Sequence, residues 1–187
     1  MSELLRPLTV ADLEALPSDL PSGPVRYELD NGRLVIMPPP GDIHGASQSN
    51  FAAELKIQGE RKGLGKARTE VAVILRRNPD RVVGPDDVFI TNASLPIKLS
   101  PEGYLETIPE LIVEVRSKND TDKEVQSKVD EYIQAGVKVV LEADPKAQTI
   151  TIHRPKQAPQ VLGPDDFLTV EDIIPGFSVK VREVLQA

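Results

Sequence analysis

A nearly continuous apolar run, Leu111-Ile112-Val113-Glu114-Val115, constrains the fold of this chain more than any other feature. Such a run is typical of a central β-strand that is buried on both faces. Its one carboxylate, Glu114, is costly to bury unless it is paired or holds a metal ion. Two simpler interpretations stay open. Glu114 could pair with Arg116, which shares its face of the strand, or the strand could be half exposed.

Three elements are predicted before this run. Thr9 to Asp12 has the pattern of a capping box, which predicts a short helix that ends before Pro17. Val25 to Met37 predicts a β-hairpin around Asn31-Gly32, because Asn-Gly is the strongest short hairpin signal. Apolar residues near helical spacing predict a longer helix from His44 to about Lys62.

The rest of the chain alternates strand and helix signals. A second capping box at Thr121 to Glu124 predicts a helix that ends at Gly136. The pattern indicates an α+β fold, in which two main helices lie before and after the apolar strands of a mixed sheet. The other predicted segments are strands at Thr69 to Leu75, Val88 to Ile90, Val137 to Leu141 and Thr149 to His153, a loop over residues 91–109, and short strands from Val161 to Val184.

Length and composition narrow the class of protein. The 187 residues favour one domain over residues 1–187. The absence of cysteine excludes disulfides and the common zinc sites, and it suits a cytoplasmic location. No apolar run is long enough to span a membrane, and residues 1–7 lack the pattern of a signal peptide. The net charge of -7 argues against a passive nucleic-acid coat protein, although it also fits simple solubility.

Pro85-Asp86 lies directly before the predicted strand at Val88 and is the second candidate for chemistry. The alternative is an ordinary turn, since Pro-Asp is a common turn pair. The tetrapeptide Gly84-Pro85-Asp86-Asp87 occurs a second time in the chain, as Gly163-Pro164-Asp165-Asp166, so the tetrapeptide alone does not identify a site. Only the first copy is followed by the apolar strands, so Asp86 is the stronger candidate.

Lys128 is the third candidate, on the helix that follows Glu114. On a helical wheel it falls at the edge of the inner stripe formed by Val125, Val129 and Tyr132, so its amine can reach the sheet. The alternative is a surface lysine whose stem covers apolar surface.

Together these segments resemble a known family. Pro109 to Asp120 is similar to the segment P-D-L-V-V-E-V-L-S-P-S-D of the Uma family of restriction-endonuclease-like proteins. Further matches follow in order over almost the whole chain: Tyr27-Glu28-Leu29 with Asn31-Gly32-Arg33-Leu34, His44, Pro85-Asp86, Lys128 to Tyr132, Gly136-Val137, Asp144-Pro145 and Pro175-Gly176-Phe177.

The resemblance implies the PD-(D/E)XK superfold, a restriction-endonuclease-like mixed central sheet flanked by two main helices, with an N-terminal β-hairpin. In that scheme Asp86 and Glu114 hold Mg²⁺ or Mn²⁺. Glu28, on the hairpin, is expected to be a further ligand, directly or through water. Hard oxygen ligands suit both ions. His44 is expected to orient a ligand or a phosphate.

The chain departs from the family scheme at one position. The usual lysine lies two residues after the glutamate, where this chain has Arg116. Arginine cannot act as a general base but can bind phosphate. Lys128 is expected to supply the amine instead, and the spacing Lys128-x-x-x-Tyr132 resembles the Q-x-x-x-Y helix motif of RecB-like nucleases.

These observations predict a metal-dependent endonuclease that hydrolyses DNA, with Asp86, Glu114 and Lys128 as its catalytic residues. A homodimer is expected, because the backbone of duplex DNA has two-fold symmetry. The first alternative is a catalytically inactive nucleic-acid-binding or regulatory module on the same fold. A glycosidase that uses the two carboxylates is disfavoured, since the chain has no tryptophan and only 4% aromatic residues to stack sugars.

Overall fold

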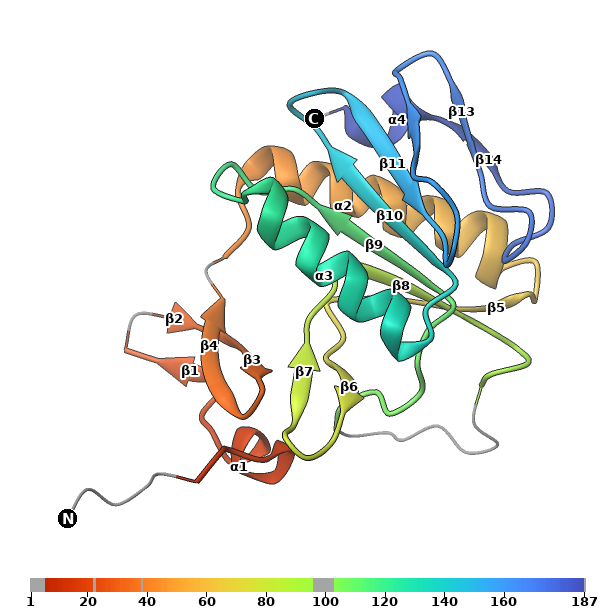
Figure 1. Cartoon of the computed structure of the whole chain (residues 1–187). Coiled ribbons are helices and arrows are strands. Elements are labelled where there is room, and N and C mark those ends of the chain that lie inside the picture. The colour runs from red at the N-terminus through yellow and green to blue at the C-terminus, as the bar shows by residue number, and fades with distance from the viewer. Residues whose placement is uncertain (1–5, 22, 38, 96–102, 187) are drawn as a thin grey trace.

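The computed structural model describes residues 6–21, 23–37, 39–95 and 103–186 (Figure 1). Residues 1–5, which belong to the start of the chain where no signal-peptide pattern was found, lie outside the described residues. So do residues 96–102 of the predicted loop. The helices are α1 (Val10–Glu14), α2 (Asp42–Glu54) with its π-helical continuation η1 (Leu55–Glu60), α3 (Asp122–Ala135) and α4 (Val181–Leu185). The strands are β1 (Asp19–Leu20), β2 (Gly23–Pro24), β3 (Arg26–Asp30), β4 (Arg33–Met37), β5 (Gly65–Thr69), β6 (Val73–Arg76), β7 (Arg81–Val83), β8 (Asp87–Thr91), β9 (Leu111–Val115), β10 (Val139–Asp144), β11 (Thr149–His153), β12 (Gln160–Leu162), β13 (Phe167–Thr169) and β14 (Ser178–Lys180).

A mixed six-stranded sheet forms the centre of the fold, in the order β12-β11-β10-β9-β8-β5. Strands β9 and β10 are parallel, because helix α3 connects them as a crossover, and the other neighbours are antiparallel. The predicted α+β fold with a mixed sheet is therefore confirmed. The predicted strand Leu111 to Val115 has the bounds of β9, which lies in the interior of the sheet beside β8.

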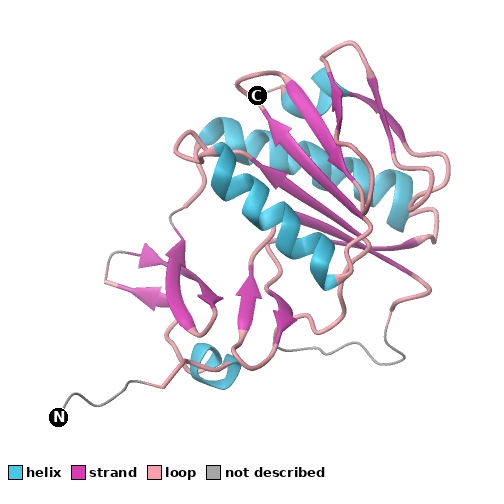
Figure 2. Cartoon of the chain, viewed as in Figure 1, coloured by secondary structure: helices cyan, strands magenta, loops and turns pink. Residues whose placement is uncertain are grey.

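The two long helices cover opposite faces of this sheet (Figures 1 and 2). Phe51 of α2 packs in one core cluster with Val113 of β9. Tyr132 of α3 packs in a second cluster with Ile112, the neighbouring residue of the same strand. Successive residues of β9 alternate between the two clusters because side chains alternate along a strand. Glu114 therefore shares the α3 face with Ile112.

A smaller four-stranded sheet, in the order β4-β3-β7-β6, lies beside the main sheet (Figure 1). Its β3-β4 hairpin confirms the predicted turn, since Asn31 and Gly32 have φ angles of 52° and 75°. Helix α1 begins with the predicted capping box, and Leu13 packs with Leu29 of β3 in a third core cluster. This sheet forms one wall of the pocket described below.

The predicted strand Thr69 to Leu75 is wrong. Thr69 ends β5 in the six-stranded sheet, and Val73 begins β6 in the four-stranded sheet. Between them Glu70 has a φ angle of 52°, a left-handed conformation that interrupts the extended chain. The apolar residues Val73 and Leu75 do lie in one cluster, which explains why the segment resembled a single strand.

Two further predictions need correction. The predicted helix from His44 begins at Asp42 and ends as the π-helical turn η1 at Glu60. The tail contains helix α4 in addition to the short strands that were expected, because Val181, Val184 and Leu185 form a helical stripe in the core.

Helix α3 follows its sequence signals closely. Thr121 and Glu124 form the predicted capping box, and Gly136 ends the helix with a φ angle of 111°.

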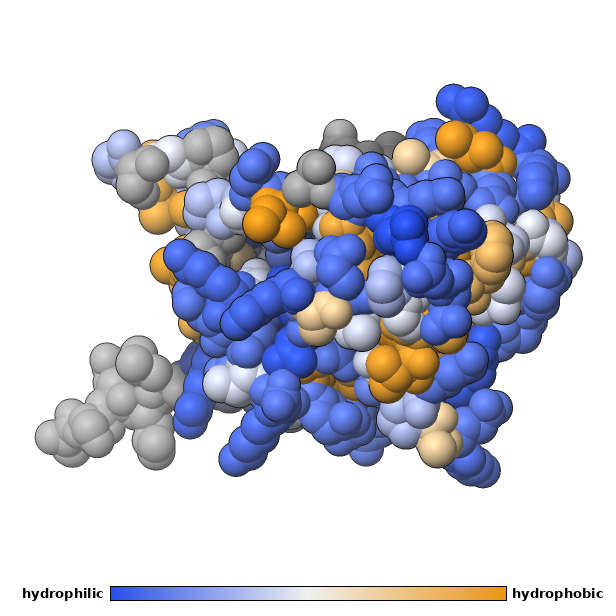
Figure 3. Space-filling model, turned by 90° about the horizontal axis from the view of Figure 1, so that it is seen from above, coloured by the Kyte–Doolittle hydropathy of each residue, from blue (hydrophilic) through white to orange (hydrophobic). Residues whose placement is uncertain are grey.

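None of the helices in the described part of the chain is both long and apolar enough to cross a membrane. On the face seen in Figure 3, hydrophobic areas are small and separated by hydrophilic surface.

Candidate active site

A pocket of about 220 Å³ lies between the two sheets and the loop that follows β9. It brings together five of the side chains that the sequence singles out for chemistry. These are Glu28 from β3, His44 from α2, Asp86 before β8, Glu114 from β9 and Lys128 from α3. Its other lining residues are Arg26, Tyr27, Met37, Pro39, Pro40, Gly84, Val115, Ser117, Asn119 and Asp120.

Asp86 is fixed by contacts from both sides. Its Oδ2 accepts a hydrogen bond from the backbone N–H of Val115 at 2.8 Å and lies 3.3 Å from His44 Nε2. Its carbonyl oxygen accepts the N–H of Glu70 at 3.0 Å and Nε2 of Gln48 at 3.1 Å. Among the described residues, only Oδ2 of Asp86 makes side-chain contacts, which leaves Oδ1 for a ligand.

Glu114 is held by two side chains of helix α3. The hydroxyl of Tyr132 donates to its Oε1, and Nζ of Lys128 lies 3.3 Å from its Oε2. Burial raises the pKa of Glu114, and the nearby Lys128 ammonium opposes that shift. The negative charge of Glu114 raises the pKa of Lys128 in turn. Lys128 is therefore an ammonium ion at neutral pH, which suits charge stabilisation rather than proton abstraction.

Glu28 connects the hairpin to the segment that carries Asp86. Its Oε1 accepts the backbone N–H of Gly84 at 2.9 Å, and its Oε2 lies 3.5 Å from Arg81. Arg81 also binds Glu131 of α3 at 2.8 Å. The buried Glu28 therefore helps to set the distance between the small sheet and the floor of the pocket.

His44 faces Asp86 from the first turn of α2. The hydrogen bond to Asp86 raises the pKa of His44, although burial opposes that shift. Its Nδ1 is buried and has no hydrogen-bond partner among the described residues. The same is true of Ser47 Oγ, one turn along the helix, and of both carboxyl oxygens of Asp87.

Asp87 is fully buried behind the site, on the α2 face of the sheet. Burial, with the negative charges of Asp86 and Glu70, raises the pKa of Asp87 to about 8. Asp87 is therefore largely a neutral carboxylic acid at pH 7.

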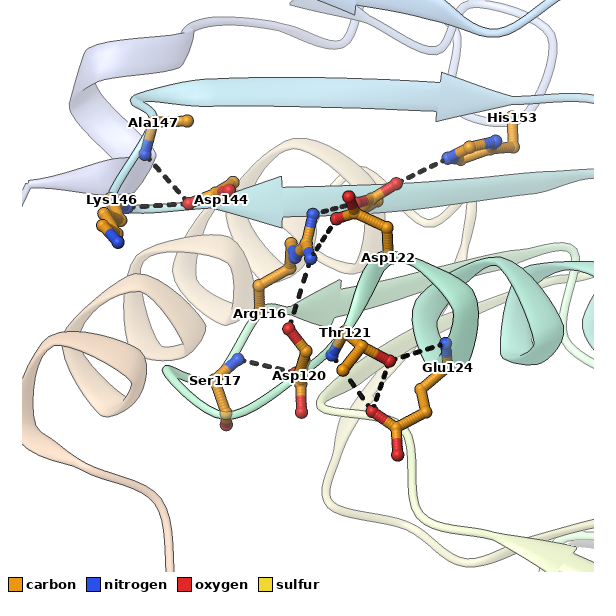
Figure 4. A network of polar contacts seen from close by, with 11 residues as sticks. Arg116, Ser117, Asp120, Thr121, Asp122, Glu124, Asp144, Lys146, Ala147 and His153 are labelled. Carbon is orange, nitrogen blue, oxygen red and sulfur yellow. Dashed lines mark hydrogen bonds and ion pairs between the residues drawn. The ribbon is translucent and has the colours of Figure 1, made fainter.

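Arg116 and Tyr132 do not line this pocket. The guanidinium of Arg116 binds Asp122 at 2.6 Å and Glu142 at 3.3 Å (Figure 4). Glu114 is paired with Lys128, so the simpler interpretation of a Glu114–Arg116 pair is wrong. Tyr132 is fully buried and reaches the site only through its hydroxyl.

Sequence reasoning missed three residues around Asp86. Gln48 lies one turn after His44 on the same helix, and that spacing was a usable signal. Asp87 was visible as the second half of an acidic doublet. Glu70, which forms an ion pair with Arg26 at 3.0 Å, lay inside a segment that was interpreted as a strand and had no signal of its own.

The donor chemistry of the pocket fits a hard divalent cation, because Glu28, Asp86 and Glu114 are three of the four carboxylates that line it, with Asp120. As they stand, these carboxylates accept hydrogen bonds from the protein. No three His, Asp or Glu side chains in the described part of the chain are arranged to hold an ion together. An ion would therefore have to compete with contacts such as Lys128 to Glu114.

Comparisons with known proteins agree with this fold. The chain is similar to a crystal structure of a putative nuclease belonging to DUF820 from Anabaena variabilis, with a TM-score of 0.77 and 19% sequence identity. The likeness covers 96% of this chain and 98% of that one, and it shows a shared fold. No curated protein matches the chain. The sequence model of Uma2, described as "Putative restriction endonuclease", matches residues 10–182, and the chain belongs to this family.

Proposed function

We propose that the protein is a metal-dependent endonuclease that hydrolyses phosphodiester bonds of DNA. The observation that supports this most is the convergence of Asp86, Glu114 and Lys128 on one pocket, in a chain of a restriction-endonuclease family. The residue types match the reaction, because hydrolysis of a phosphodiester needs carboxylates for a cation and a positive charge for the anionic transition state.

Asp86 and Glu114 would hold Mg²⁺ or Mn²⁺, with Glu28 as a third ligand. When bound, the cation supplies a more acidic water and screens the charge of the phosphate. In the described part of the chain, four carboxylates and two permanently charged cations, Arg26 and Lys128, line the pocket. The net charge of these lining side chains is negative, which explains why phosphate binding should depend on the bound metal ion.

The side chains of this protein have separate tasks in the proposed reaction. Lys128 keeps an ammonium beside the reacting phosphate and stabilises the charge that develops on it. Tyr132 and Lys128 fix the two oxygens of Glu114, and the N–H of Val115 fixes Asp86. His44, whose pKa Asp86 raises, lies 3.3 Å from Asp86 at the start of α2 and helps to hold that carboxylate in place.

A second candidate function is a catalytically inactive nucleic-acid-binding or regulatory module. Two observations favour it. Arg116 occupies the position where the superfold has a lysine, and it is bound to protein carboxylates. Lys128, the substitute amine, has a raised pKa and cannot accept a proton near neutral pH.

One cleavage assay separates these candidates. The protein is incubated with single-stranded DNA, duplex DNA and RNA of one sequence, with Mg²⁺, Mn²⁺ or EDTA. We expect cleavage of DNA with either cation and none with EDTA or in the Glu114→Gln variant. Metal-dependent DNA binding without cleavage by the wild type would favour the inactive module. The absence of both would overturn the proposal.

Two further features belong to this proposal. The enzyme acts as a homodimer, since two sites related by two-fold symmetry match the two strands of a duplex. Light scattering at high protein concentration tests this, and a monomer under those conditions would contradict it. A cytoplasmic location suits the cysteine-free chain and gives access to DNA.

A further inference from the structure

Arg116 stands at the end of β9, two residues after Glu114, and its guanidinium is enclosed by protein acceptors. One nitrogen, Nη1, donates to Glu142 Oε1 at 3.3 Å. The other, Nη2, donates to Asp122 Oδ1 at 2.6 Å and to the carbonyl of Asp120 at 3.4 Å. Figure 4 shows Arg116 between the strands and the start of helix α3.

Glu142 is itself held from behind. It lies on β10, directly beside Glu114 in the parallel register of β9 and β10. Its Oε2 lies 2.9 Å from His153 Nε2 on β11, and the His153 side chain is only 7% exposed. Arg116, Glu142 and His153 thus form a chain of polar contacts across three adjacent strands. None of them lines the pocket of about 220 Å³, although Arg116 lines a smaller cavity of about 50 Å³ beside it, with Glu114 and Lys128.

Helix α3 meets strand β9 at two places along its length. Its first residue, Asp122, binds Arg116, and about two turns later Lys128 and Tyr132 bind Glu114. Residues two apart on a strand share a face, so both anchors lie on the same side of β9. The contact at Arg116 therefore sets where the helix begins relative to the strand, and with it where the Lys128 ammonium lies.

We propose that Arg116 is a positioning residue, held by Glu142 and His153, that places helix α3 and its Lys128 over the site and does not itself bind the phosphate. Three of its five N–H donors, including both on Nη2, already have protein acceptors. This inference rests on the proposed nuclease function for its kinetic test, although its structural test does not.

The kinetic test compares Arg116→Ala with Arg154→Ala. Arg154 is a matched control, because its side chain is also 20% exposed and also binds a carboxylate, that of Asp172. We expect Arg116→Ala to lower kcat for a fluorescent DNA oligonucleotide by about 10-fold or more, since a small misplacement of a reacting group is costly. KM should stay within about 2-fold of wild type. Arg154→Ala should leave both unchanged.

A second variant guards against a failure of Arg116→Ala to fold. Asp122→Ala removes the other half of the contact at a side chain that is 94% exposed, so the fold should survive. We expect a smaller decrease in kcat, about 3-fold, in the same direction. A rise in KM or in the dissociation constant of the oligonucleotide, with kcat unchanged, would show that the guanidinium binds substrate and would overturn the inference.

The structural test needs no activity. Hydrogen exchange measured by mass spectrometry should be about 10-fold faster in the first two turns of α3 in Arg116→Ala, and unchanged there in Arg154→Ala. Equal exchange in wild type and Arg116→Ala would overturn the inference. If the wild type cleaves no substrate, the proposed function fails, while this exchange measurement still decides the role of Arg116.

Discussion

Nζ of Lys128 lies 3.3 Å from Oε2 of Glu114, so the one amine that lines the pocket among the described residues touches the carboxylate of the central strand. Lys128→Ala should reduce cleavage by about 10²-fold or more, because a charge at the reacting phosphate is lost. Metal binding should survive, since the proposed ligands are carboxylates. Steady-state cleavage and calorimetric titration with Mn²⁺ measure the two effects separately.

Lys123→Ala is the control for this prediction. Lys123 lies on the same helix but is exposed on its outer side. It should cleave at the wild-type rate. If Lys128→Ala does so as well, Lys128 is only a surface residue and is not the third member of the site.

Asp86→Ala should abolish binding of Mn²⁺ and cleavage, because it removes a proposed ligand with an oxygen free for the ion. The repeated tetrapeptide offers a control, since Asp165 holds the equivalent place in the second copy and its side chain is 80% exposed. Asp165→Ala should bind Mn²⁺ like the wild type. Calorimetry on both variants checks this, and retained binding in Asp86→Ala would remove Asp86 from the metal site.

Tyr132→Phe should destabilise the fold by about 1–3 kcal/mol, the usual cost of losing a hydrogen bond to a buried charged group. The fully buried Tyr132 hydroxyl donates to Glu114, and phenylalanine fills the same space without it. Urea unfolding measures the difference in the free energy of unfolding. An unchanged midpoint would mean that water or another group replaces the hydroxyl.

Asp87 should make stability depend on pH in a defined direction. Its pKa is raised to about 8 in the folded protein, so the folded state holds a proton that the unfolded state releases above about pH 4. This group therefore lowers the free energy of unfolding as pH rises from about 4 to about 8, and has no further effect above that.

Asp87→Asn should remove this slope. In EDTA, the free energy of unfolding of the wild type should fall between pH 5 and pH 8 by at least about 1 kcal/mol more than that of the variant. Guanidinium unfolding at both pH values gives the comparison. Parallel pH profiles for the two proteins would show that the buried carboxyl titrates normally.

Sequence reasoning located the parts of the fold whose signals are local. The strand Leu111 to Val115 is continuous because both of its faces are buried, and helix α3 begins and ends at residues that cap helices. The break at Glu70 could not be predicted, because no glycine, proline or asparagine marks its left-handed conformation. That break is set by the two sheets it joins.

The residues of the candidate site also fall into two groups, those that a local sequence pattern reveals and those whose contacts depend on the fold. Asp86, Glu114 and Lys128 were found because each departs from its local pattern or matches a family motif. The partners of Arg116, by contrast, depend on the parallel pairing of β9 with β10, which puts Glu142 beside it. No spacing in the sequence reveals a contact of that kind.

The chain passes between the small sheet and the main sheet three times before β9: after β4, between β5 and β6, and between β7 and β8. His44, Glu70 and Asp86 lie on or next to these three passages, and the last two are tied by a backbone hydrogen bond. The two walls of the pocket are therefore joined by three chain segments, so any movement of one wall against the other must be absorbed at all three.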